Sequence, residues 1–141
     1  MDAQDKRIEA IIGDMEGKDS SEALESFYNH LCRSLQLPCD VTGYEDFRWE
    51  ERYVIGGRDP KEYEQLKKKQ PSYSDRYELL GLDKDGTSEW MMFDEDIVAH
   101  VKRKSDGKEF WLGLAELEAL DKKSPNGQLL NDYGVYLVNN R

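Results

Sequence analysis

The segment from Glu95 to Leu114 constrains the fold most, because it holds two strand-like runs on either side of a turn. The runs IVAHVKRK and EFWLGL are rich in β-branched and aromatic residues, and Ser105-Asp106-Gly107 separates them. Asp-Gly supplies positive φ at little cost, which suits the turn of a hairpin. The segment therefore predicts a two-stranded antiparallel hairpin.

Other segments have the periodicity and the boundary residues of helices. Asp19 and Glu22 have the spacing of a capping box, and apolar residues then recur at helical spacing from Leu24 to Leu35. This helix should stop at Leu37, because the residue before a proline is pushed towards extended geometry. Further helices are expected over residues 1–16, 59–69 and 126–140. The run LAELEAL, which begins at Leu114, is expected to form a short helix or a 3₁₀ turn.

These elements predict an α+β fold in a single domain covering residues 1–141, with the N-terminal helix of residues 1–18 loosely attached. The chain of 141 residues is long enough to bury one core. We expect a small, strongly curved antiparallel sheet or an SH3-like β-barrel with flanking helices. Its strands should come from residues 39–55, 74–82 and 96–114.

The charge of the chain narrows the classes of partner. Thirty acidic and twenty basic residues give a formal net charge of −10. This charge repels phosphate backbones and anionic lipids, so we expect no nucleic acid and no membrane as partner. A divalent cation or a basic protein remains attractive, although such a charge also serves solubility.

The cysteines and histidines indicate neither a disulfide framework nor a zinc site. Cys32 and Cys39 are the only cysteines, and the first ten residues contain no apolar run typical of a signal peptide, so we expect a cytoplasmic protein with free thiols. Cys32 follows the apolar stripe of its helix and is expected to be buried. Neither His30 nor His100 has a neighbouring nucleophile, and the protein is predicted not to be an enzyme.

Two stretches are rich in carboxylates. Residues 43–53, GYEDFRWEERY, mix acidic and aromatic side chains, for which packing is the default interpretation and a protein interface the alternative. In the stretch around DKDG an EF-hand is excluded, because placing Gly86 at the sixth position of that loop puts Gly81 at the first and Met92 at the twelfth. A calcium site of another kind, a face for a basic partner and a solvated turn all remain open for this stretch. Its acidic residues are Asp83, Asp85, Glu89, Asp94, Glu95 and Asp96.

The order of segments resembles the small bacterial calcium-binding proteins of the CcbP-like family. A helix leads into LQLPCDV, and strands, the acidic loop DKDGTSEWMMFDED, the hairpin runs, LAEL and a last helix follow. The resemblance covers most of residues 20–138, with RDPKEYEQLKKKQPSY as an extra insertion. It implies an acidic cytosolic protein, without EF-hands, that is built on a small β-barrel and binds Ca²⁺ through surface carboxylates.

By this resemblance the chain is expected to be a non-catalytic Ca²⁺ buffer or sensor, and the six acidic residues of the loop are its expected metal ligands. A bend around Trp90 to Phe93 could bring Asp83, Asp85 and Glu89 close to Asp94, Glu95 and Asp96. The alternative function is an interaction module, of the inhibitor or immunity type, whose acidic and aromatic face docks on a basic partner.

Overall fold

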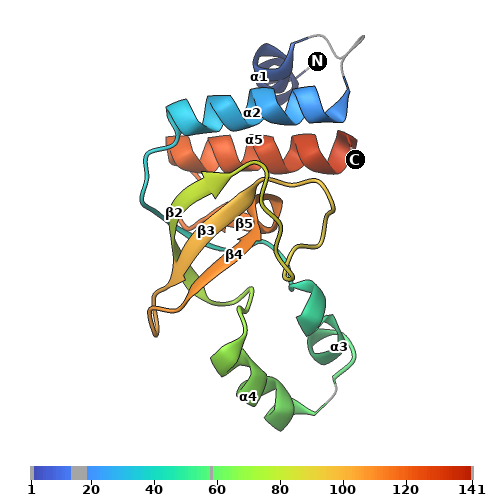
Figure 1. Ribbon diagram of the computed structural model, residues 1–141, viewed down its shortest axis with the longest axis vertical. Coiled ribbons are helices and arrows are strands. Elements are labelled where there is room, and N and C mark those ends of the chain that lie inside the picture. The colour runs from blue at the N-terminus through green and yellow to red at the C-terminus, as the bar shows by residue number, and fades with distance from the viewer. Residues whose placement is uncertain (1, 14–18, 58, 141) are drawn as a thin grey trace.

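An antiparallel sheet of five strands forms the centre of the molecule (Figure 1). The structure is a computed structural model that describes residues 2–13, 19–57 and 59–140. The strands are β1 (Cys39–Gly43), β2 (Arg76–Asp83), β3 (Val98–Arg103), β4 (Glu109–Gly113) and β5 (Leu117–Ala119), in the spatial order β4-β3-β2-β1-β5. The fold class is α+β, as the sequence predicts. The predicted hairpin is also confirmed, since β3 pairs antiparallel with β4 and Gly107 has a φ of 78° in the turn.

The sheet is curved but open, so the expected SH3-like barrel is not supported. Strands β4 and β5 lie at opposite edges, although only the 3₁₀ helix η2 (Leu114–Glu116) separates them in the chain. The sheet must therefore bend sharply, and a register shift between Leu79 and Gly81 in β2 contributes, because a bulge bends its strand. The expected 3₁₀ turn is η2, whereas the residues after it form β5.

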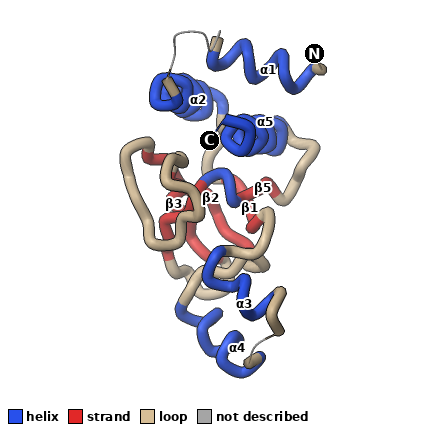
Figure 2. The backbone as a smooth tube through the Cα atoms, turned by 90° about the vertical axis from the view of Figure 1, so that its right-hand side faces the viewer, coloured by secondary structure: helices blue, strands red, loops and turns tan. Residues whose placement is uncertain are grey.

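Three helices cover one side of the sheet. They are α1 (Ala3–Ile12), α2 (Ser20–Ser34) and α5 (Pro125–Asn140). Figures 1 and 2 show α2 and α5 side by side next to the sheet, with α1 on their outer side. The core between the two layers is aromatic: the Phe27 ring stacks on Tyr136 at 5.0 Å between centroids and meets Tyr133 edge-on at 5.4 Å. Burial of these apolar faces supplies the main driving force for folding.

The helix starts agree with the predictions, and two details differ. The carboxylate of Asp19 accepts a hydrogen bond from the Glu22 N–H at 2.8 Å, but α2 ends at Ser34, because Leu35 is already extended. Cys32 is exposed, which corrects its expected burial: the buried side of α2 consists of Ala23, Leu24, Phe27 and Leu31, and the next residue after Leu31 turns away. The first helix ends before Gly13, and residues 14–18 lie outside the described residues.

The stretch after β1 was expected to contribute strand, and that prediction is wrong for residues 48–54. These residues form η1 (Arg48–Glu50) and α3 (Glu51–Val54), followed by the expected α4 (Pro60–Lys69). The side chain of Glu50 explains the turn, because it is fully buried and accepts from the backbone N–H of Phe47 at 3.1 Å and of Tyr73 at 2.9 Å. The hydroxyl groups of Tyr63 and Ser72 donate to its other oxygen.

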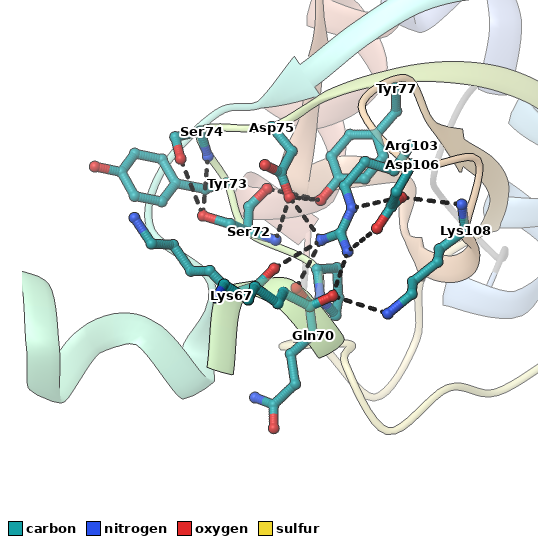
Figure 3. A network of polar contacts seen from close by, with 12 residues as sticks. Lys67, Gln70, Ser72, Tyr73, Ser74, Asp75, Tyr77, Arg103, Asp106 and Lys108 are labelled. Carbon is teal, nitrogen blue, oxygen red and sulfur yellow. Dashed lines mark hydrogen bonds and ion pairs between the residues drawn. The ribbon is translucent and has the colours of Figure 1, made fainter. Parts of the chain in front are cut away.

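Arg103 fastens the α4 segment to the hairpin (Figure 3). Its guanidinium is 1% exposed and donates to Asp106 at 2.7 and 3.0 Å and to Asp75 at 3.0 Å. It also donates to three backbone carbonyls at the end of α4, those of Lys67, Lys68 and Gln70. The hydrogen bonds from Arg103 lower the pKa of Asp106 to about 2. A buried guanidinium needs such a complete set of acceptors, because leaving it unpaired is costly.

Within the described residues, no helix combines the length and the apolar character that a membrane crossing requires.

Replacing Arg103 by Ala should lower the free energy of unfolding by about 3 kcal/mol, because it removes six hydrogen bonds to two carboxylates and three carbonyls. Urea denaturation measures this loss. The matched control is Lys102→Ala, which truncates the exposed neighbour and should change the stability by less than about 0.5 kcal/mol. Equal stabilities of the two variants would show that Arg103 does not hold the α4 segment.

Candidate metal centre

The β3–β4 hairpin brings together two acidic residues that lie just before β3 and just after β4 in the chain. Its pairing places Val98 opposite Gly113, and the Leu114 N–H donates to the Ile97 carbonyl at 2.8 Å. The same register, extended further, places Asp96 against Ala115, whose N–H lies 3.3 and 3.2 Å from the two Asp96 carboxylate oxygens. The next residue is Glu116, which η2 turns inwards. The hairpin register therefore determines that Asp96 and Glu116 are neighbours.

The two carboxylates share a buried space that exists because residue 113 is glycine. Asp96 is 3% exposed and Glu116 is 8% exposed. A Cβ atom on Gly113 would lie 2.5 Å from Asp96 Oδ2 and 2.7 Å from Glu116 Oε2. The two oxygens are thus no farther apart than the sum of these distances. Any larger residue at position 113 would displace the carboxylates.

The donors around the pair are neutral and do not satisfy every oxygen. The Tyr133 hydroxyl donates to Asp96 Oδ1 at 2.5 Å and accepts from the Ile97 N–H at 3.0 Å. The Met92 N–H donates to Glu116 Oε2 at 3.1 Å. Glu116 Oε1 is buried and has no hydrogen-bond partner in the described part of the chain. Among the described residues, no lysine, arginine or histidine forms an ion pair with either carboxylate.

This environment disfavours the ionised form of both groups. Burial raises the pKa of Asp96 from 3.8 to about 7, and the charge of Glu116 adds to the rise, while the hydrogen bonds from Tyr133 and Ala115 act in the opposite direction. Burial likewise raises the pKa of Glu116 from 4.5 to about 7, against the hydrogen bond from Met92. Two ionised carboxylates in a shared buried space repel each other, so the pair would gain from a cation.

The other acidic residues of the loop lie outside the buried space that Asp96 and Glu116 share. Asp83, Asp85, Glu89, Asp94 and Glu95 are all exposed, and of the six predicted ligands only Asp96 is buried. Asp83 accepts from the Asp85 N–H at 3.0 Å, and Glu95 accepts from the Ser20 hydroxyl of α2 at 3.0 Å. In the described chain, no three or more His, Cys, Asp or Glu side chains gather in an arrangement that could hold a metal ion. The six-residue ligand set remains a prediction.

The acidic and aromatic stretch of residues 43–53 serves packing, which was its default interpretation. Phe47, Glu50 and Tyr53 are buried. The ring of Tyr53 stacks on Tyr63 of α4 at 5.1 Å, and Trp49 donates from its indole N–H to the Pro71 carbonyl at 2.6 Å. This stretch therefore packs against α4 and the segment that follows it.

Glu116 was missed by sequence reasoning, although the sequence contained a signal for it. The Asp-Gly turn fixes the register of the hairpin, and counting two residues past Val98 and Gly113 sets Asp96 opposite Ala115. An acidic residue next to that position was therefore a candidate partner for Asp96. The burial of Glu116 depends on the turn of η2 and on how the helices pack against the sheet. The local sequence reveals neither.

Comparison with known proteins shows which solved structures have a similar fold. No protein-family model and no curated protein matches the sequence. The crystal structure of Anabaena CcbP matches with a TM-score of 0.59 and 20% identity, over 95% of this chain and 88% of that chain. A calcium-binding protein in its calcium-binding form matches with a TM-score of 0.60 and 18% identity, over 96% of this chain and 90% of that chain. The chain thus has the fold of these proteins, and the resemblance predicted from the sequence is confirmed at that level.

The buried pair should make the metal-free protein less stable as the pH rises. The unfolded chain loses the two protons near pH 4, whereas the folded chain keeps them up to about pH 7. The folded state therefore binds more protons between these values, and its free energy of unfolding should fall as the pH rises from 5 to 8. Urea denaturation in the presence of a chelator measures the slope.

Asp96→Asn and Glu116→Gln should each flatten this slope, because the amide does not titrate. The control is Glu45→Gln, a change of the same chemistry at an exposed position, which should keep the slope of the unchanged protein. If all four proteins show the same dependence on pH, the two carboxylates are not destabilised by burial.

Proposed function

We propose that this chain is a small, non-catalytic Ca²⁺-binding protein that acts as a buffer or sensor. The observation that carries the proposal is the buried pair of Asp96 and Glu116, in which one carboxylate oxygen has no hydrogen-bond partner among residues 2–13, 19–57 and 59–140. Such an oxygen is normally paired in a folded protein, because burying it unpaired costs free energy. A bound cation would supply the missing partner and remove the repulsion between the two groups.

The donor set favours Ca²⁺ over other common ions. Both proposed ligands are carboxylates, and hard cations prefer oxygen, whereas structural zinc sites use mainly sulfur and imidazole. Mg²⁺ requires a near-octahedral arrangement and loses its water reluctantly, while Ca²⁺ accepts irregular sets of six to eight oxygens. Two protein carboxylates leave several positions for water or further oxygens. This arrangement is consistent with weak to moderate affinity.

The exposed acidic residues of the loop have a supporting role in this proposal. Asp94 and Glu95 precede Asp96 directly, and Asp83 lies opposite Val98 in the strand pairing at the other end of the loop. We assign two roles to these exposed residues: they attract the ion, and they supply additional oxygens once it is bound. They are Asp83, Asp85, Glu89, Asp94 and Glu95. Their contribution should weaken as salt screens it, and the contribution of the buried pair should depend less on salt.

Calorimetry on chelator-treated protein tests the function. Ca²⁺ should bind with measurable heat, and Mg²⁺ should bind more weakly. Asp96→Asn and Glu116→Gln should each weaken Ca²⁺ binding at least about tenfold, because each removes one of two charges that face the ion at short range. The double change Asp83→Asn with Asp85→Asn should weaken it less, and its effect should vanish in high salt.

The control is Glu64→Gln in α4, which changes the net charge by the same amount at an exposed position, at the end of the sheet opposite the helical layer, and should leave the affinity within about twofold. Absence of heat with millimolar Ca²⁺ would contradict the function. Unchanged affinity in both Asp96→Asn and Glu116→Gln, with loss in the loop variant, would contradict the assignment of the buried pair and leave the loop as the site.

A further inference from the structure

The outer edge of β4 offers backbone groups that no strand of the described chain uses. β4 stands at the end of the strand order and pairs only with β3. Leu114 donates to Ile97, and in an antiparallel ladder every second residue makes such bonds, so Phe110 and Leu112 direct their N–H and C=O groups at β3. Glu109 and Trp111 alternate with them and direct theirs away from the sheet. An edge of this kind can accept a further strand.

The side chains next to this edge form an aromatic and acidic surface. Trp111 is 48% exposed, and its ring lies parallel to His100 at 4.7 Å between centroids. His100 Nε2 is 2.8 Å from the Glu109 carboxylate, so both polar neighbours of Trp111 are held in place. The stacked ring is a fixed platform, because moving it would break the contact with His100.

The edge also forms one wall of a groove of about 540 Å³. The segment from Thr87 to Trp90, which belongs to the acidic loop, and Lys69 of α4 also line the groove. The lining thus includes two indoles, Trp90 and Trp111, and two carboxylates, Glu89 and Glu109. Extended peptides bind to such sites through backbone pairing, with alternate side chains facing the aromatic and charged residues.

The net charge of the chain and the acidic residues of the groove indicate which kind of partner would bind. The chain has a net charge of −10, and two acidic residues line the groove against the single Lys69. A second copy of the chain would bring another charge of −10 to the same edge, which disfavours pairing of β4 with itself. A basic segment gains from the long-range attraction and from cation–π contact with the indole rings.

We propose that the β4 edge binds an extended, basic segment of a partner protein as an additional strand, with its cationic side chains between Trp90 and Trp111. The backbone of Trp111 and Glu109 pairs with the segment, and Glu89 and Glu109 attract it. The groove shares residues 87–90 with the acidic loop but does not include Asp96 or Glu116, so binding does not require Ca²⁺.

A peptide of defined sequence tests the proposal on the 141-residue chain in the presence of a chelator. The probe is an acetylated and amidated hexapeptide of alternating Lys and Val, and binding is followed by the backbone NMR signals of residues 109–113 and by tryptophan fluorescence. We expect binding that weakens with salt, with the largest shifts at Glu109 and Trp111. The peptide with Glu in place of Lys should bind at least about tenfold more weakly.

Two substitutions separate the backbone contribution from the side-chain contribution. Trp111→Ala removes the ring and should weaken binding at least about fivefold. Trp111→Pro also removes the outward N–H, which an edge strand tolerates, and should weaken binding further. Ile55→Ala shortens an apolar side chain of 74% exposure that does not line the groove, and it should have no effect. Circular dichroism checks that each variant is folded.

Several results would overturn the proposal. They are equal binding of the Lys and Glu peptides, equal affinity of Trp111→Ala and Trp111→Pro, or shifts confined to another part of the chain. Sedimentation of the chain alone as a dimer that Trp111→Pro dissociates would also overturn it, because the edge would then pair with a second copy. No binding of the Lys peptide at millimolar concentration would count against a basic segment.

Discussion

Two carboxylates buried beside each other are the feature on which the proposed site depends. The other charged groups in the interior are compensated: Arg103 has two carboxylates and three carbonyls, Glu50 has four donors, and Asp132 pairs with Arg7 at 2.8 Å. Asp96 and Glu116 instead lie beside each other, and Glu116 Oε1 has no hydrogen-bond partner among the described residues. Since folded proteins pair buried polar groups, this exception marks a place where an ion would contribute the missing partner.

The fold holds this pair rigidly and keeps it away from the α3–α4 segment. Tyr133 of α5 donates to Asp96, and Met92 of the acidic loop donates to Glu116. Contacts from both α5 and the loop therefore fix the position of the carboxylates. The α3–α4 segment lies at the opposite end of the sheet from the helical layer (Figures 1 and 2), where Arg103 and Glu50 attach it. An insertion at that end leaves the hairpin register, and therefore the pair, unchanged.

Much of the fold could be predicted because its signals are local. The Asp-Gly turn, the Asp19 cap and the apolar periodicity each act over a few residues, and the corresponding elements are where they were expected. The helix over residues 51–54 was missed, because the buried Glu50 that shapes it depends on donors more than ten residues away. The candidate site was found only in part for the same reason. Composition draws attention to the exposed carboxylates of the loop, whereas Glu116 becomes significant only through its burial beside Asp96.

The location of a bound ion tests the central claim most directly. Crystals grown with Ca²⁺, or with Tb³⁺ as an anomalously scattering substitute, would place the ion relative to the hairpin. The account predicts an ion in contact with the carboxylates of both Asp96 and Glu116, next to Gly113. An ion held only by exposed loop residues such as Asp83 and Asp85, with Asp96 and Glu116 still hydrogen-bonded to Tyr133, Ala115 and Met92, would contradict it.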